Sequence, residues 1–242
     1  MCGICGIIGQ GDGESVRAML GRLVHRGPDD EGLHREPGVA LGARRLRVID
    51  PEGGRQPVRN ETGTVWAVMN GEIYNYRELR GELLRKGHRL SSRCDTEVLV
   101  HLYEDEGLEG FRRLRGMFAL ALWDRDRDTA WLVRDRLGIK PLYYTVRPGE
   151  AGIGTRVIFS SELPSLLEAL PDWRVRPQAI ADYLTYLYVP GPDTIVEGVY
   201  QLRPGEAVGV SRGRLEFRRY YRPTEEASCT VFDDADVHDR DE

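Results

Sequence analysis

The sequence is short of the features that mark secreted, membrane and nucleotide-binding proteins. Its 242 residues include only four cysteines, which is too few for a disulfide framework. The longest uninterrupted apolar run, residues 117–123, is far shorter than a membrane span, and no signal-peptide pattern occurs. A Walker A phosphate loop is also missing. These absences predict a soluble protein of a reducing cytoplasm, with no membrane partner.

The sequence also lacks a net positive charge. The net charge is −5, and residues 224–242 hold eight acidic residues and one arginine. Residues 1–223 carry a net charge of +2, which does not suggest a nucleic-acid partner. Arginine outnumbers lysine by 32 to 2, a ratio that we attribute to genomic base composition. We expect residues 222–242 to form a disordered acidic tail or the start of a linker.

The apolar patterns predict an α+β protein with mostly antiparallel sheets. Residues 117–124 are apolar without alternation, so we expect this strand to be covered on both faces. Residues 25–32 are rich in Gly, Pro and Asp and predict a loop. Further strands are expected at 1–9, 39–46, 64–69, 130–134, 141–146 and 156–161, a hairpin at 206–220, and helices at 16–24, 76–86, 95–106 and 178–187.

Cys2 is the strongest chemical signal, because removal of the initiator methionine would place a free amine and a thiol on one residue. An α-amino group has a pKa of about 7.7–8.0, so it can serve as the base for its own thiol. Cys2 and Cys5 also form a C-x-x-C pattern, which allows a redox or zinc interpretation. Zinc would need two further ligands, and His25 is the only nearby candidate. On a strand, residues 2 and 5 would point to opposite faces.

Other polar residues stand beside predicted strands. Arg45 follows a run of small and apolar residues and could hold a carboxylate, although a surface arginine is the simpler interpretation. Asn70 and Gly71 offer an amide and a backbone N–H suited to an oxyanion, or a plain turn. Asp95 stands at a predicted helix start, where capping is the usual role. The glycines of residues 9–13 do not have dinucleotide-binding spacing, and we interpret them as a tight turn.

Nine segments, in order, resemble the glutaminase domain of class II glutamine amidotransferases, most closely that of glutamine-hydrolysing asparagine synthetases. They are MCGICGIIG (1–9), HRGPD (25–29), RRLRVID (44–50), MNGEIYNYRELR (69–80), CDTEVLVHLYE (94–104), GMFALALWD (116–124), RDRLGIKPLYY (134–144), FSSE (159–162) and YVPGPDTIVEGVYQLRPGE (188–206). The resemblance implies one glutaminase domain over residues 2–221. Its implied fold is the four-layer αββα N-terminal-nucleophile hydrolase fold, with two stacked antiparallel sheets.

The resemblance also implies catalytic roles. Cys2 would attack the side-chain amide carbon of L-glutamine and carry the resulting thioester. The side chain of Asn70 and the N–H of Gly71 would hold the oxyanion. We expect His25 and Asp29, which lie in a matching motif, to have structural roles.

The implied substrate-binding residues come from three segments. Arg45 would bind the α-carboxylate of glutamine. Asp95, helped by Glu72, would bind the α-ammonium group. The backbone around Leu46 and Val48 would line the pocket. We expect no metal site and no cofactor in this chain.

The sequence lacks the Ser-Gly-Gly-x-Asp-Ser loop of an asparagine synthetase's ATP-using domain. ATP and magnesium are therefore expected only in a separate or missing synthetase, to which this chain would supply ammonia. We also consider a homodimer of this chain. One alternative function is a non-catalytic glutamine-binding or regulatory module. Another is the same hydrolysis with a different acceptor, as in amidophosphoribosyltransferases or sugar-phosphate amidation.

Overall fold

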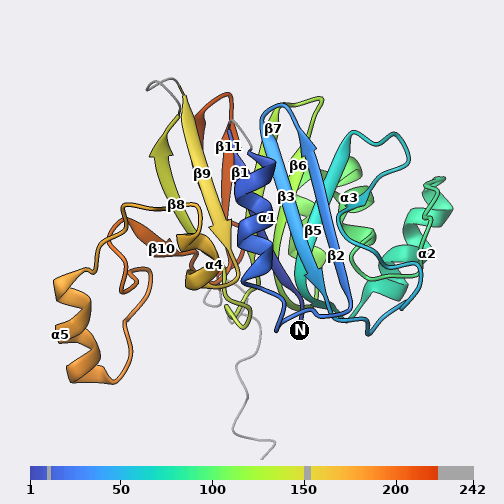
Figure 1. The fold of residues 1–242 in the computed structure, drawn as a ribbon. Coiled ribbons are helices and arrows are strands. Elements are labelled where there is room, and N and C mark those ends of the chain that lie inside the picture. Colours follow the sequence, from blue (N-terminus) through green and yellow to red (C-terminus); the bar gives the residue numbers. More distant parts are fainter. Residues whose placement is uncertain (10–11, 150–153, 223–242) are drawn as a thin grey trace, which may run out of the picture.

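Two six-stranded sheets lie face to face between layers of helices in the computed structural model (Figure 1). The structure describes residues 1–9, 12–149 and 154–222. The strand order is β10-β8-β9-β1-β3-β2 in the first sheet and β12-β11-β7-β6-β5-β4 in the second. The ladders between neighbouring strands are antiparallel. The predicted α+β class with two stacked antiparallel sheets is confirmed.

The elements have the following bounds. The first sheet contains β1 (Gly3–Ile8), β2 (Asp30–Glu36), β3 (Val39–Arg45), β8 (Tyr143–Pro148), β9 (Thr155–Ser160) and β10 (Val199–Gln201). The second contains β4 (Val58–Arg59), β5 (Val65–Ile73), β6 (Gly116–Asp124), β7 (Thr129–Arg134), β11 (Glu206–Ser211) and β12 (Arg214–Arg219). The helices are α1 (Gly13–Gly21), α2 (Tyr76–Lys86), α3 (Val98–Glu106), the 3₁₀ helix η1 (Gly107–Arg113), α4 (Leu163–Leu167) and α5 (Pro177–Tyr186).

Three hydrophobic clusters fill the three spaces between the four layers. The first joins α1 and α4 to the outer face of the first sheet, the second lies between the sheets, and the third joins the second sheet to α2, α3 and η1. β1 contributes to two of them, because Cys5 and Ile7 face α1 whereas Ile4 and Ile8 face the other sheet. Burial of apolar area on both faces of both sheets is the main term that stabilises this stacking.

β6 illustrates how residue size sets the layer spacing. Its Phe118, Leu120 and Leu122 face the helices, whereas Ala119 and Ala121 face the first sheet. The small side chains allow the two sheets to approach, and the large ones fill the space under α3. The prediction that this strand is covered on both faces is confirmed.

Some predicted boundaries were wrong, for identifiable reasons. β5 continues through residues 70–72 to Ile73, because β6 pairs with it along its whole length, so these residues form no turn. α3 begins at Val98, after a turn over residues 95–97. The Asp95 carboxylate does not cap this helix and instead accepts a hydrogen bond from Ile73 N at 3.0 Å. The first helix ends at Gly21, earlier than predicted.

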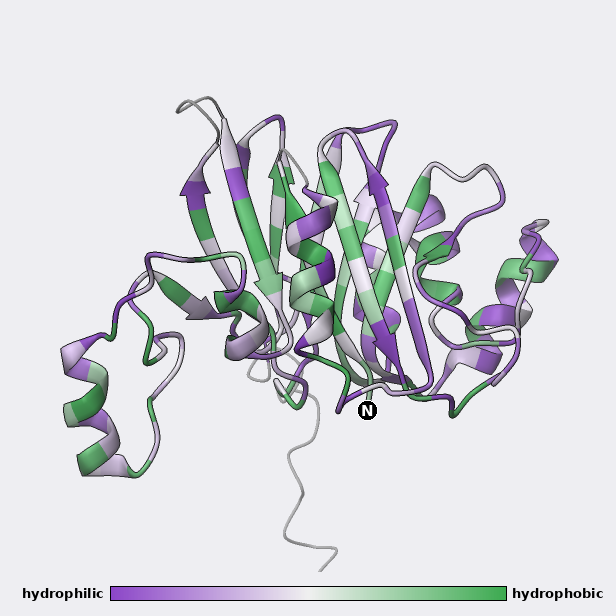
Figure 2. Ribbon diagram, in the orientation of Figure 1, coloured by the Kyte–Doolittle hydropathy of each residue, from purple (hydrophilic) through white to green (hydrophobic). Residues whose placement is uncertain are grey.

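β2 was missed by the sequence analysis. Residues 25–32 were expected to form a loop, yet β2 begins at Asp30. It is an edge strand that carries mostly polar residues, and Figure 2 shows it largely hydrophilic beside the apolar strands of the same sheet. Such an edge lacks the apolar alternation that identifies a strand, and its charges discourage pairing with other chains.

The predicted helix over residues 76–86 is confirmed, with Gly87 in the left-handed conformation at its end. Among the described residues, no helix combines the length and apolar character needed to cross a membrane. The predicted acidic tail lies outside the described residues, apart from residue 222.

Asp135 ties the turn after β7 to the centre of the second sheet. It is fully buried, and its Oδ1 accepts hydrogen bonds from the N–H groups of Leu137 and Ile139, both at 3.0 Å. Its Oδ2 accepts from the N–H groups of Phe118 at 3.2 Å and Lys140 at 3.0 Å. Four backbone donors are therefore satisfied by one carboxylate.

We expect Asp135→Asn to destabilise the fold, because its amide nitrogen would face backbone donors and leave two of them without an acceptor. The free energy of unfolding should fall by about 2–4 kcal/mol, as measured by urea denaturation. Asp128→Asn is the matched control, since Asp128 is exposed in a turn and its positive φ suits asparagine. Equal stability of the two variants would contradict this account.

Candidate active site

All eight residues singled out by the sequence line one cavity. Its volume is about 130 Å³, some ten times the roughly 10–15 Å³ that a single water needs, so it can hold a small molecule. Cys2 precedes β1 in the first sheet, and the other residues come from β3, the segment after it, β5, and the segment before α3. The predicted residues in its lining are Cys2, Arg45, Leu46, Val48, Asn70, Gly71, Glu72 and Asp95.

Cys2 is held by the central strand of the first sheet. β1 is buried at all six positions and pairs with β3 on one edge and β9 on the other. The thiol of Cys2 lies in the cavity, 3.9 Å from the carbonyl oxygen of Leu46. The Cys5 thiol is fully buried against α1, 3.9 Å from Val16 O. The two cysteines therefore face different surroundings and do not form a shared redox or zinc site.

Asn70 and Arg26 connect the two sheets at the cavity. The Asn70 side chain is fully buried on β5, and its Nδ2 donates to the carbonyl oxygen of Cys2 at 2.7 Å. Its Oδ1 accepts from Arg26 Nη2 at 3.2 Å. Arg26 Nε donates to the same Cys2 carbonyl at 3.0 Å, and Nη1 donates to Glu162 at 2.8 Å. An amide nitrogen carries two hydrogens, so Asn70 keeps one for a ligand.

Gly71 faces the cavity with its backbone. Along a strand, successive residues direct their N–H and C=O groups to opposite edges. Met69 directs both groups away from β6, to the Gln56 side chain at 2.7 and 3.1 Å, and Ile73 N–H reaches Asp95 at 3.0 Å. Gly71 lies midway between these two residues, so its N–H points to the same edge, into the cavity.

The opposite strand supports this orientation of Gly71. The residue opposite Gly71 on β6 is Phe118. Its N–H donates to the Asp135 carboxylate at 3.2 Å and its C=O accepts from Asp135 N at 2.8 Å, so both groups point away from β5. A Cβ on residue 71 would lie 2.2 Å from Met117 O, so only glycine fits this close approach of the strands.

Arg45 is almost entirely buried at the cavity wall. Its two terminal nitrogens donate to the carbonyl oxygens of residues 49–51 at 2.7–3.1 Å and to Asp30 at 3.2 Å. The guanidinium can lie this close to the chain because residue 54 is a glycine. A Cβ at Gly54 would be only 2.6 Å from Arg45 Nη2. These contacts fix the guanidinium in place, and its positive charge lies beside the cavity.

Asp95 and Glu72 add negative charge to the same cavity. The Asp95 side chain is buried, and this burial raises the pKa of its carboxyl group above the usual range, against the hydrogen bond from Ile73 N. A cation bound in the cavity would stabilise the ionised form. Glu72 lines the cavity from β5. Paired with Arg45, these carboxylates make the cavity suitable for a zwitterion.

The sequence analysis missed Arg26 and Lys140. Lys140 lines the cavity, is buried, and places Nζ 2.8 Å from the sulfur of Met1. Burial, followed by the positive charge of Arg26, lowers the pKa of this lysine. A signal was present, because Lys140 is one of only two lysines in an arginine-rich chain and lies in the matching segment 134–144. Arg26 lies in the quoted HRGPD segment, but a single arginine carries little information by itself.

His25 and Asp29 lie outside the cavity lining. His25 Nε2 is 3.0 Å from Glu162. Asp29 accepts from Arg47 N at 2.9 Å, and its own N–H donates to Arg45 O at 3.1 Å. These contacts hold the 25–29 segment against the ends of β3 and β9. Among the described residues, the group with metal-ligand spacing is Glu61, His88, His101 and Glu104, outside this cavity.

Known proteins share this sequence pattern and fold. Asparagine synthetase [glutamine-hydrolyzing] 1 of Bacillus subtilis (strain 168) is 35% identical over 99% of this chain, which spans 40% of that relative. Asparagine synthetase [glutamine-hydrolyzing] 2 of the same organism is 41% identical over 69% of the chain, which spans 22% of it.

Two solved structures have the same fold as this chain. A structure of the allosteric regulatory enzyme of purine biosynthesis superposes with a TM-score of 0.65 at 18% identity, over 91% of this chain and 49% of that one. Glutamine phosphoribosylpyrophosphate amidotransferase from B. subtilis gives 0.61 at 18% identity, with the same coverage. The profile of the glutamine amidotransferase domain family matches residues 1–221. The chain therefore belongs to the family of class II glutamine amidotransferase domains.

Proposed function

We propose that this domain hydrolyses L-glutamine to L-glutamate and ammonia through a thioester on Cys2. The observation that carries the proposal is the convergence of a thiol, two oxyanion donors and groups of both charges on one cavity. A free amino acid carries a carboxylate and an ammonium group next to each other, and Arg45 with Asp95 and Glu72 matches that pair. A peptide-bound glutamine lacks the free ammonium group and would leave the buried Asp95 carboxylate without a cation.

Removal of Met1 is the first step of the proposed chemistry. Met1 lines the cavity beside Cys2, so its removal would leave the α-amine of Cys2 next to the thiol. The amine takes the thiol proton, and the sulfur attacks the amide carbon of glutamine to form a tetrahedral intermediate. The amine returns the proton to the leaving nitrogen, so ammonia departs and the γ-glutamyl thioester remains. Water, deprotonated by the same amine, then releases glutamate and restores the thiol.

The oxyanion of both intermediates would lie between Asn70 Nδ2 and Gly71 N–H. Loss of one such donor typically costs about 2.7–4 kcal/mol of transition-state stabilisation. These steps use only groups of the chain, so we propose that hydrolysis needs no cofactor. The non-catalytic alternative predicts glutamine binding without glutamate release.

Replacement of the nucleophile tests this proposal. Cys2→Ala should lower glutamine-dependent glutamate release by at least about 10³-fold, measured with purified protein whose intact mass shows loss of Met1. Cys5→Ala is the matched control and should retain the rate, since its thiol faces α1. A fused N-terminal tag that prevents exposure of Cys2 should act like Cys2→Ala. Undiminished hydrolysis by Cys2→Ala would refute the mechanism.

Arg26 should act as a positioning residue, because its guanidinium joins the Cys2 carbonyl, Asn70 and Glu162. We expect Arg26→Gln to lower kcat by about 10²-fold through misplacement of the nucleophile and the oxyanion donor. Arg26→Lys should not rescue the rate, because an ammonium group cannot reproduce the planar three-way contact. Arg22→Gln is the control, since Arg22 lies on the same segment and forms an exposed pair with Glu168. Equal kcat values for the Arg26 and Arg22 variants would contradict the positioning role.

We further propose that the ammonia passes to an ATP-dependent synthetase, as a separate subunit or domain, with aspartate as the acceptor. The chain spans 40% of the first Bacillus subtilis relative named above, an asparagine synthetase. ATP and magnesium would be bound by that synthetase. We also propose a cytoplasmic location, since Cys2, Cys5 and Cys94 are free thiols.

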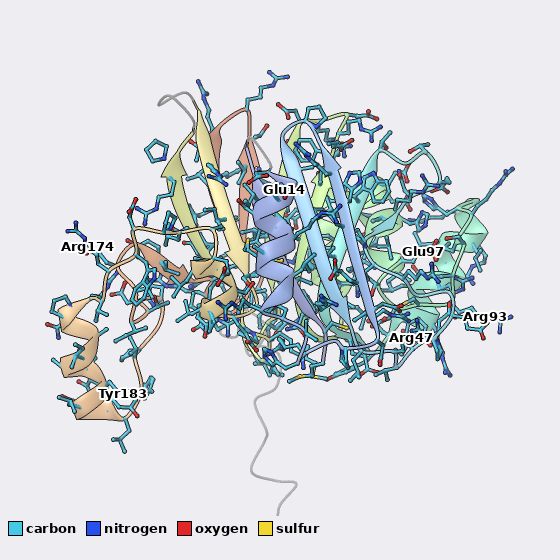
Figure 3. All side chains as sticks on the ribbon, viewed as in Figure 1. Glu14, Arg47, Arg93, Glu97, Arg174 and Tyr183 are labelled. Atoms are coloured by element: carbon cyan, nitrogen blue, oxygen red, sulfur yellow. The ribbon has the colours of Figure 1, made fainter. Side chains whose placement is uncertain are left out.

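The surface of α5 supports a protein partner. Its Leu184 and the following Leu187 are 75% and 79% exposed, and Tyr183 on the same helix, labelled in Figure 3, is 52% exposed. Figure 1 shows α5 apart from the two-sheet body. Neighbouring exposed apolar side chains of this size typically mark an interaction surface. We assign this surface to the synthetase. A homodimer through α5 is the competing outcome.

Coupled turnover separates these outcomes. The chain alone, given glutamine, aspartate, ATP and Mg²⁺, should release glutamate and free ammonia without asparagine, and addition of a cognate synthetase domain should yield asparagine. Leu184→Glu should keep the glutaminase rate and reduce asparagine formation, with exposed Glu109→Gln as control. Asparagine made by the chain alone would contradict the proposal. Dissociation of a dimer by Leu184→Glu, seen by light scattering, would assign α5 to self-association.

A further inference from the structure

A second group of ionisable side chains lies outside the glutamine cavity. Glu61 follows β4, His88 follows the end of α2, and His101 and Glu104 lie on α3. Each offers one nitrogen or oxygen atom, and these atoms all lie within 4.8 Å of one another. We name this group the His–Glu cluster. It brings together three segments that are distant in the sequence.

His101 is the most unusual member of the His–Glu cluster. It is fully buried, and neither ring nitrogen makes a hydrogen bond of acceptable geometry within the described part of the chain. Its Nδ1 is nevertheless only 2.9 Å from Glu61 Oε2, and its Nε2 is 3.8 Å from Glu97 Oε1. A buried imidazole is normally hydrogen-bonded, because an unsatisfied polar atom costs about 1–3 kcal/mol. Its Nδ1 therefore lies next to the Glu61 carboxylate of the cluster without a well-aligned hydrogen bond.

His88 is oriented as a metal ligand would be. Its Nε2 lies 3.0 Å from Asp105 Oδ1, and its Nδ1 lies 3.2 Å from Glu61 Oε1 and 4.0 Å from Glu104 Oε2. With the proton on Nε2 toward Asp105, Nδ1 directs its lone pair into the cluster. A carboxylate behind a histidine is the usual outer partner of metal-bound imidazole.

The remaining contacts fix the two glutamates. Glu61 Oε1 accepts from Arg89 N at 3.0 Å, and Glu104 Oε2 accepts from Asn60 Nδ2 at 3.2 Å. His101 and Glu104 are three residues apart on α3 and so share one face of the helix. Two imidazole nitrogens and two carboxylates converge here. With the ring protons directed away from the cluster, this arrangement is repulsive by itself and attractive around a cation.

We propose that Glu61, His88, His101 and Glu104 bind a zinc ion. Two imidazoles and two carboxylates suit zinc, whereas calcium and magnesium favour oxygen ligands. Zinc bonds of about 2.0–2.2 Å at tetrahedral angles place ligand atoms about 3.3–3.6 Å apart. Three pairs in the cluster are 2.9, 3.2 and 4.0 Å apart, and all the ligand atoms lie within 4.8 Å of one another, so small side-chain shifts would close the site around the ion. This proposal differs from the expectation, made from the sequence, that the chain holds no metal.

The proposed role is structural. Zinc would fasten the segment after β4 and the segment after α2 to α3, the helix that follows Asp95 in the chain. Because such a site forms only in the folded chain, its binding free energy adds to stability.

Zinc titration of the full chain tests the proposal. Calorimetry near neutral pH should give one zinc per chain, and zinc should raise the Tm. Asp105→Asn should weaken zinc binding by about 10–100-fold, and His88→Asn and Glu104→Gln by more. Glu109→Gln is the matched control and should bind as the native chain does, since Glu109 is exposed on η1. Glu104→Gln, on an exposed position, keeps the test usable if His88→Asn fails to fold.

Two controls separate this site from the thiols of the cavity. Cys2→Ala should bind zinc with unchanged affinity. A cobalt-substituted chain should show d–d bands without thiolate-to-cobalt charge transfer. The proposal is overturned if zinc fails to bind, if His88→Asn and Glu104→Gln bind as tightly as Glu109→Gln, or if Cys2→Ala abolishes binding. The first two results would identify the cluster as a polar network that holds no metal.

Discussion

The free edge of β5 is the constraint around which the candidate site is built. β4 pairs with β5 only at residues 66–67, so the edge groups beyond them need other partners. The Gln56 side chain satisfies Met69, and the Asp95 carboxylate satisfies Ile73. Gly71 lies between them with its N–H toward the cavity. The N–H groups of Met69 and Ile73 on this edge are thus already hydrogen-bonded, and the N–H of Gly71 between them is the one proposed to bind the oxyanion.

The two sheets must keep a fixed separation for this edge of β5 to face Cys2. Three apolar clusters set the layer spacing, and polar contacts then set the register at one end. Arg26 and Asn70 both bond to the carbonyl oxygen of Cys2, and so join the first sheet to β5. On the far side of β6, Asp135 takes both backbone groups of Phe118, the residue opposite Gly71. A buried carboxylate outside the cavity therefore supports the orientation of the oxyanion donor.

Much of this arrangement could be predicted from local patterns. Uninterrupted apolar runs identified β1 and β6, because these strands are buried along most of their length. The spacing of Leu79 and Leu83 identified the helix over 76–86, because they form its one buried face. The polar edge strand β2 could not be found this way, because its ladder with β3 rather than apolar burial defines it. Asn70 was predicted beside a turn and lies inside β5, since pairing with β6 extends the strand beyond its apolar residues. The segment matches placed eight residues in one site, and the cavity brings all eight together.

The sequence by itself determined the α+β class, the resemblance to a glutaminase domain and the residue types of the site, because these follow from local order along the chain. Only the tertiary structure decided which backbone groups face the cavity and that Arg26 and Lys140 join the site. It also decided that His88 and His101 meet Glu61 and Glu104. The reason is physical: strand edges, hydrogen-bond direction and ligand separations of a few ångströms arise from pairing between distant segments, and no local pattern encodes them.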